Sequence, residues 1–230
     1  MEKEEVKTKF EWPPLESDPE IFNTYLRNIG LSYEHEFVEV FSLDIESLLM
    51  IPQIVLAVIV NISRGENKCN FDNMIKINYT DVPFYMLQTG SLDNACGIVA
   101  ALHAIGNNPK NINIVENSIL SQFYEKCKEK TPKERSEILE NFQDFKKKHE
   151  VFSKEGQSKL CNNQSDVRGH YIAFAILNDK LIEFDGVKGS PILLEENVKS
   201  QDFIMRVGEI LKNRIKIKEI TENMSMMYLS

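Results

Sequence analysis

The chain has 230 residues, 42% of them hydrophobic and 27% charged, which is the balance of an ordinary soluble globular protein. That length fits one large domain or two small ones with a sizeable core. The formal net charge of −8 disfavours nucleic acid and anionic membranes as partners and favours a basic partner. The longest apolar run, 48–60, contains Pro52 and Gln53 and is too short to span a bilayer.

The cysteines and the N-terminus bear on metal binding and on location. Cys69, Cys96, Cys127 and Cys161 show no CxxC spacing, so we expect no zinc site, no redox motif and no cofactor. Residues 1–10 lack the apolar stretch of a signal peptide. We therefore expect reduced thiols and a cytoplasmic location, with the nucleus as an alternative.

The first half of the chain predicts one amphipathic helix and one central strand. Asp18 before Pro19 is typical of a helix N-terminus, and helical spacing of apolar residues continues to a stop at Gly30. The run 54–60 (IVLAVIV) is apolar throughout and rich in β-branched residues, which predicts a strand covered on both faces. Further elements expected here are a strand at 37–41, a short helix at 44–50 and a loop at 69–85.

The second half predicts a buried helix and a hairpin. The run 96–105 (CGIVAALHAI) is apolar on nearly every side, so this helix belongs inside a domain. Strands are expected at 170–177 and 180–184, joined by a hairpin turn at Asn178 and Asp179. Further elements expected here are a helix at 118–127, a capping box at 131–134 that opens a helix to about 148, a long polar loop at 151–169, a helix at 198–211 and a final strand at 215–220.

Cys96 stands in the first turn of the buried helix. The N-terminus of a helix carries partial positive charge, which favours the thiolate form of a cysteine placed there. Gly97 beside it allows backbone or substrate to approach closely. A buried helical cysteine is more often an inert part of the core, so a nucleophilic role requires a base nearby.

Among the four histidines, His170 is the best candidate for that base. His103 lies seven residues after Cys96, roughly 10 Å along the helix axis, so we expect a packed core residue. His35 and His149 lie in polar segments that we expect to be exposed. His170 begins one hairpin strand and Asp185 follows the other, so pairing brings them to the same end. Papain-type chemistry needs a thiolate, an imidazole and an orienting group, although a structural role for His170 also fits its position.

The residues around these positions resemble the ubiquitin carboxyl-terminal hydrolase family, especially its short, single-domain members. The resemblance covers most of the chain, and its motifs are specific in combination. The matching segments are 12–16 (WPPLE) with 18–20 (DPE), 50–52 (MIP), 94–97 (NACG), 102–105 (LHAI), 131–135 (TPKER), 149–150 (HE), 155–157 (EGQ), 170–173 (HYIA), 183–186 (EFDG) and 191–192 (PI).

The resemblance implies a papain-like α/β (α+β) fold with a mainly antiparallel central sheet between helices and a knotted backbone. It implies a single catalytic domain over 1–230, with a crossover loop at about 151–169 that limits the leaving group to small adducts or short peptides. It implies that Cys96 attacks the terminal glycine carbonyl of ubiquitin, that His170 transfers the proton and that Asp185 orients His170. Alternatives are a ubiquitin-binding protein with impaired catalysis and a hydrolase that prefers a ubiquitin-like modifier.

One position departs from the family pattern. The family places an oxyanion-hole glutamine six residues before the nucleophile, where this chain has Gly90, and the nearby Gln88 lies eight residues before Cys96. Either residues 89–93 bulge and leave Gln88 in place, or the hole uses the Cys96 N–H and another donor such as Asn94. We favour the first, because glycine and serine suit a longer turn.

The partner expected from the resemblance is ubiquitin, whose C-terminal tail is basic. Carboxylates near the cleft would steer such a tail, and Glu16 and Glu39 are the candidates. Both also fit the role of solvated surface charges. Leu15 is a candidate apolar contact or a core residue, and we expect the protein to be a monomer.

Overall fold

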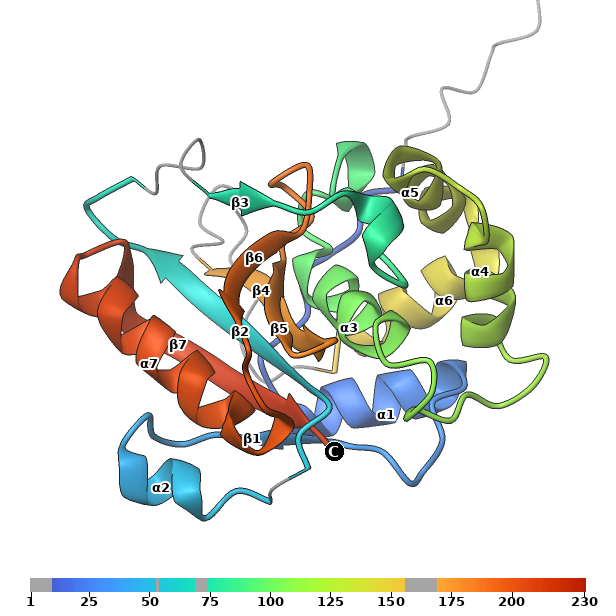
Figure 1. The fold of residues 1–230 in the computed structure, drawn as a ribbon. Helices are drawn as coiled ribbons and strands as arrows, with labels where there is room; N and C mark the ends of the chain where they lie inside the picture. The colour runs from blue at the N-terminus through green and yellow to red at the C-terminus, as the bar shows by residue number, and fades with distance from the viewer. Residues whose placement is uncertain (1–9, 53, 69–73, 156–168) are drawn as a thin grey trace, which may run out of the picture.

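The computed structural model describes residues 10–52, 54–68, 74–155 and 169–230, and it builds them around one antiparallel sheet (Figure 1). The strand order is β1-β7-β2-β4-β5-β6-β3. The strands are β1 (Phe37–Glu39), β2 (Ala57–Arg64), β3 (Ile75–Lys76), β4 (Gly169–Leu177), β5 (Lys180–Phe184), β6 (Ile192–Glu196) and β7 (Ile220–Leu229). The helices are α1 (Pro19–Ile29), α2 (Ile45–Leu49), α3 (Cys96–Gly106), α4 (Ile119–Cys127), α5 (Pro132–Asn141), α6 (Gln143–Phe152) and α7 (Phe203–Lys216). The predicted α/β fold with a mainly antiparallel sheet is confirmed.

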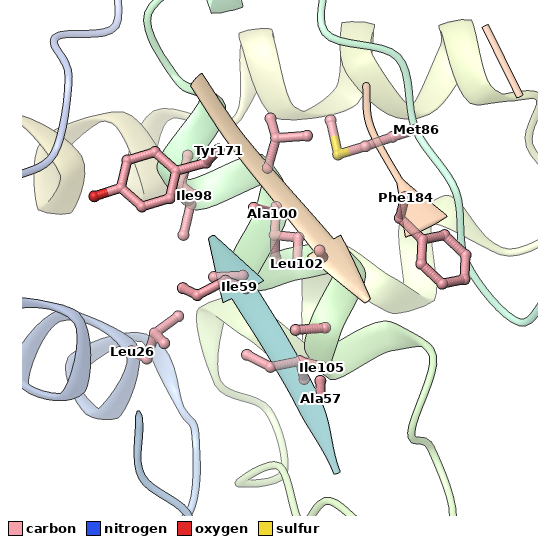
Figure 2. Packing of buried hydrophobic residues seen from close by; sticks show 14 of the residues in the cluster. Leu26, Ala57, Ile59, Met86, Ile98, Ala100, Leu102, Ile105, Tyr171 and Phe184 are labelled. Carbon is pink, nitrogen blue, oxygen red and sulfur yellow. The ribbon is translucent and has the colours of Figure 1, made fainter. Parts of the chain in front are cut away.

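Apolar side chains on both faces of the central strands divide the core into two parts. In β2, Ala57 and Ile59 belong to the cluster that includes α1 and α3–α6, whereas Val58 and Val60 belong to the cluster with α2 and α7. This is the alternation of successive side chains along a strand. Figure 2 shows Ile59 among the side chains packed beside α3. The prediction of a central strand covered on both faces is confirmed, although β2 begins at Ala57.

The predicted hairpin is present and sets the register of the site. Asn178 and Asp179 have φ of 52° and 60°, the left-handed conformation that a type I′ turn needs at both central positions. The turn pairs Ala173 of β4 with Phe184 of β5. His170 and Asp185 therefore lie at the same end of the hairpin, as the sequence predicts.

The prediction of one helix from 131 to about 148 is wrong. The capping box at Thr131 and Glu134 is present, but Phe142 has an extended backbone and separates α5 from α6. The two halves have different partners, because α5 packs on α4 whereas α6 packs on α1. Tertiary packing here outweighs local helix preference. Helix α6 continues to Phe152, so the first residues of the expected loop at 151–169 are helical, and residues 156–168 lie outside the described residues.

The predicted C-terminal boundaries are also wrong. The helix expected at 198–211 is α7 (Phe203–Lys216), and residues 215–216, expected to start the last strand, are part of it. Lys218 then has a φ of 59°, which turns the chain before β7 begins at Ile220. Strand β7 lies between β1 and β2, and its methionine-rich sequence gives only a weak strand signal. Within the loop expected at 69–85, residues 75–76 form the edge strand β3.

The two histidines expected to be exposed are buried. His149 is fully buried on α6, and its Nε2 lies 2.7 Å from the carbonyl oxygen of Pro13. His35 is 8% exposed, and its Nε2 accepts a hydrogen bond from the N–H of Asn113 at 3.0 Å. Both predictions failed because each ring has a backbone partner from a distant part of the chain, which removes the cost of burying a polar group.

A substitution in the sheet tests the core. Ile59→Ala removes a fully buried side chain between β2 and α3, and we expect it to lower the free energy of unfolding by about 2–5 kcal/mol in urea. Ile45→Ala is the matched control, because Ile45 is 60% exposed and its loss is expected to stay within about 0.5 kcal/mol. Equal effects of the two variants would contradict the assignment of Ile59 to the core.

Candidate active site

Cys96 is the first residue of α3, and its thiol is free. The N-cap residue, Ala95, offers no side-chain acceptor, so no N-cap side chain satisfies the first-turn N–H groups. Residues 96–105 are buried, and Cys96 itself is 5% exposed. At Gly97 an added Cβ would lie 3.2 Å from Phe22 and 3.4 Å from Leu15, so the helix start packs closely against the N-terminal segment.

The structure brings His170 and Asp185 together as predicted. His170 Nε2 lies 2.7 Å from Asp185 Oδ1, and the same oxygen accepts a hydrogen bond from the Val187 N–H at 3.1 Å. Burial works to raise the pKa of Asp185, but the hydrogen bond and charge of His170 outweigh it and the pKa is lowered. Asp185 is therefore an ionised carboxylate that holds the imidazole.

The third member of the predicted triad is next to that imidazole. Cys96 lies close enough to His170 to help raise the pKa of that imidazole. Because Nε2 is engaged by Asp185, Nδ1 is the ring nitrogen left for the sulfur. Burial works to lower the pKa of His170, but hydrogen bonds and charges from Asp185 and Cys96 outweigh it and raise this pKa to about 9. The imidazole is thus protonated at neutral pH, and an imidazolium beside a cysteine favours the thiolate form.

Gln88 lies at the same site. With Asp93 and His170 it lines a cavity of about 780 Å³. Its Nε2 donates to the carbonyl of Asp93 at 2.8 Å, which leaves the second amide hydrogen for another acceptor. Between Gln88 and Cys96, residues 90–92 form a 3₁₀ turn in which Gly90 has a φ of 66°. This is the bulged arrangement favoured from the sequence, and the role of Gln88 as an oxyanion donor stays a prediction.

Gly186 lets the Gln88 segment approach the turn after Asp185. An added Cβ at Gly186 would lie 2.8 Å from Gln88 Cβ and 3.0 Å from its backbone nitrogen. The Gln88 N–H donates to the Gly186 carbonyl at 2.9 Å. Only a residue without a side chain permits this contact, which fixes the distance between Gln88 and Asp185.

Tyr85 also holds Asp185, and sequence reasoning missed it. Its hydroxyl donates to the Asp185 carbonyl at 2.8 Å, and its ring stacks on His103 with 5.2 Å between centroids. His103 is fully buried, and burial lowers its pKa to about 4, so it is the neutral core histidine that the sequence predicts. No motif marks Tyr85, because its role arises from its position opposite the hairpin end.

A buried ion-pair network lies behind the carboxylate. Glu183 is fully buried and forms ion pairs with Lys188 and with Arg214 of α7. The N–H of Lys188 donates to the Asp185 carbonyl at 3.1 Å. The network therefore ties the turn that follows Asp185 to both β5 and α7. The only sequence signal for it is the position of Glu183 within the segment 183–186.

The candidate ubiquitin contacts occupy different environments. Leu15 is 5% exposed and belongs to the core cluster, which agrees with its alternative role as a core residue. Glu16 is half-buried, and its charge helps to raise the pKa of Tyr171, after the larger effect of burial. Glu39 is half-buried at the end of β1. Contact of these three residues with ubiquitin stays a prediction.

The described ranges also bear on metal binding and on membrane insertion. Within them, no group of three or more His, Cys, Asp or Glu side chains is arranged to hold a metal ion. None of the helices described combines the length and the apolar character needed to cross a bilayer.

Titration of the histidines tests the geometry of the pair without an activity assay. We expect the imidazole of His170 to titrate at about pH 9 in NMR spectra, and that of His103 at about 4. Asp185→Asn removes the anionic acceptor, so we expect it to lower the midpoint of His170 by at least about 1 pH unit. A midpoint for His170 at or below the ordinary value of about 6.5 would contradict the pairing.

Comparisons with known proteins identify the family and agree with the fold. A sequence model of ubiquitin carboxyl-terminal hydrolase, family 1, matches residues 12–216. Ubiquitin carboxyl-terminal hydrolase 3 of Arabidopsis thaliana is 36% identical over 187 residues, which cover 79% of this chain and 78% of that protein. A ubiquitin carboxyl-terminal hydrolase of Aplysia californica is 31% identical over 202 residues, which cover 87% of this chain and 93% of that protein.

A solved structure shows the same fold. The catalytic domain of Trichinella spiralis UCH37, bound to ubiquitin vinyl methyl ester, superposes with a TM-score of 0.72 over 97% of each chain, and its sequence is 18% identical. The single domain over 1–230 and the knot stay predictions, because residues 156–168 lie outside the described residues. The family match over 12–216 and the two relatives above 30% identity are decisive, and the chain belongs to ubiquitin carboxyl-terminal hydrolase family 1.

Proposed function

We propose that this protein is a cysteine-type deubiquitinase that hydrolyses ester, amide or peptide bonds at the C-terminal glycine of ubiquitin. The observation that carries the proposal is the position of His170 between Cys96 and Asp185 in a member of this family. Charge agrees with it, because a chain of net charge −8 attracts a basic tail.

The geometry supports a two-step acyl transfer. The Cys96 thiolate attacks the carbonyl carbon of the terminal glycine, and the His170 imidazolium gives its proton to the leaving group. The neutral imidazole then takes a proton from water, which attacks the thioester and releases ubiquitin. Asp185 keeps its negative charge throughout and holds the ring through Nε2. No metal or cofactor enters these steps.

The developing negative charge on the carbonyl oxygen needs hydrogen-bond donors. The Cys96 N–H stands at the N-terminus of α3, where no N-cap side chain competes for it. The free amide hydrogen of Gln88 is the proposed second donor, since Gln88 and His170 line one cavity. Fixed donors of this kind stabilise the charge at no cost in reorganisation.

Substrate size and location remain proposals that follow from the resemblance. A crossover loop within 151–169 would admit only small adducts or short peptides as leaving groups. Leu15, Glu16 and Glu39 are the proposed ubiquitin contacts, and we propose a monomer that acts in the cytoplasm.

A fluorogenic amide on the C-terminus of ubiquitin tests the activity. We expect turnover by the wild-type chain and none by Cys96→Ala, which lacks the nucleophile but retains ubiquitin binding. Cys127→Ala is the matched control and should keep full activity, because burial raises the pKa of that thiol to about 12 and leaves it unreactive.

Other outcomes identify the rival functions. If the wild-type chain shows no turnover at micromolar enzyme concentration but binds ubiquitin tightly, it is a ubiquitin-binding protein. Faster cleavage of the same fluorophore from a ubiquitin-like modifier would assign that modifier as the substrate. Activity retained by Cys96→Ala would mean that the nucleophile is another residue.

A substitution at Gln88 tests the oxyanion hole. We expect Gln88→Ala to reduce kcat by at least about tenfold, and by up to roughly 10²–10³, because the lost donor acts in the transition state. KM should change little, since the ground state does not use this hydrogen bond. A wild-type kcat for this variant would point to another donor such as Asn94.

A further inference from the structure

A half-buried contact between Glu140 and Ser91 ties the segment between Gln88 and Cys96 to helix α5. Oε1 of Glu140 accepts hydrogen bonds from the Ser91 N–H at 2.7 Å and from the Ser91 hydroxyl at 2.8 Å. Ser91 is half-buried at the centre of the 3₁₀ turn at 90–92. A hydrogen bond to an ionised carboxylate is stronger than one between two neutral groups, so this contact fixes the turn.

The same helix holds the chain on the other side of Gln88. The hydroxyl of Ser136, itself 1% exposed, donates to the carbonyl of Leu87. The Leu87 N–H donates to the carbonyl of Pro132 at 3.1 Å. Gln88 therefore lies between two residues, Leu87 and Ser91, that are both hydrogen-bonded to helix α5.

The 3₁₀ turn also determines the orientation of the Gln88 side chain. The Gln88 amide donates to the carbonyl of Asp93 at 2.8 Å, and Asp93 directly follows the turn. On the opposite side, the Trp12 N–H donates to the Ser91 carbonyl at 3.3 Å. The acceptor that holds the Gln88 amide therefore directly follows the turn that Ser91 anchors.

We infer that Glu140 is a positioning residue for the oxyanion hole, acting through Ser91 and Asp93 on the amide of Gln88. The inference rests on the proposed function, because it assigns a role to the Gln88 amide. It explains how a longer segment before Cys96 keeps Gln88 at the cavity: the extra length is folded into a turn that α5 holds by its carboxylate.

The effect of Glu140 on turnover is the first test. We expect Glu140→Ala to lower kcat about tenfold on the ubiquitin amide while KM stays within about twofold. Glu140→Gln keeps an oxygen that accepts the same bonds, so it should recover most of the rate. Glu137→Ala is the matched control on the same helix, since that exposed side chain has no hydrogen bond or ion pair within the described ranges.

A double-mutant cycle separates positioning from general stability. If Glu140 acts through Gln88, then adding Glu140→Ala to the Gln88→Ala variant should lower kcat by less than about twofold. A full additional tenfold loss in the Gln88→Ala background would overturn the inference, as would an unchanged kcat for Glu140→Ala alone. Should Glu140→Ala fail to fold, Ser91→Ala removes one of the two bonds and replaces it in the cycle.

A spectroscopic measurement tests the positioning role of Glu140 independently of the proposed hydrolase activity. The side-chain amide signals of Gln88, assigned by their absence in Gln88→Ala, should shift in ¹⁵N spectra of Glu140→Ala and not in those of Glu137→Ala. An inactive wild-type chain would refute the hydrolase proposal alone, whereas unmoved Gln88 signals in Glu140→Ala would refute the positioning role.

Discussion

The hydrogen bond between His170 Nε2 and Asp185 Oδ1, 2.7 Å long, is the contact on which the chemistry of this site depends. It occupies one ring nitrogen, so the other is left to Cys96, and it keeps the imidazole charged. The bond in turn depends on the register of β4 and β5, which the left-handed turn at 178–179 fixes. A slip of one residue would place the two side chains on opposite faces of the sheet.

Burial of Asp185 strengthens this hydrogen bond, but it also requires other groups to stabilise the buried carboxylate. A carboxylate taken out of water is costly unless charge and hydrogen bonds compensate it. Asp185 has the imidazolium, the Val187 N–H and the positive charge of Lys188 nearby. Its backbone is held by Tyr85 and, through Lys188, by the buried Glu183. The site is therefore preorganised by contacts whose residues come from β5, α7 and the segment before α3.

The sequence predicts those elements that depend only on residues close together in the chain. The hairpin, the buried helix that starts at Cys96 and the capping box at Thr131 each have a local cause: turn residues, apolar character on all sides, or a cap. The hairpin alone was enough to place His170 and Asp185 at one end of two paired strands. The position of Cys96 at the start of the buried helix made it a candidate nucleophile, and the family resemblance favoured it as their partner. The structure places His170 Nε2 2.7 Å from Asp185 Oδ1.

The errors concern features that depend on distant partners. The break at Phe142, the burial of His149 and the extent of β7 are set by packing against α1, the N-terminal segment and β1. Tyr85 and Glu140 could not be recognised for the same reason, since each acts on a residue about 50 or more positions away. Local sequence carries no record of such contacts.

We propose that Cys96, activated by His170, reacts with the C-terminus of ubiquitin. The most direct measurement is mass spectrometry of the protein after incubation with ubiquitin vinyl methyl ester, followed by mapping of the modified peptide. We expect one ubiquitin per chain, attached to Cys96. An unmodified protein, or a ubiquitin attached to Cys69, Cys127 or Cys161, would contradict it.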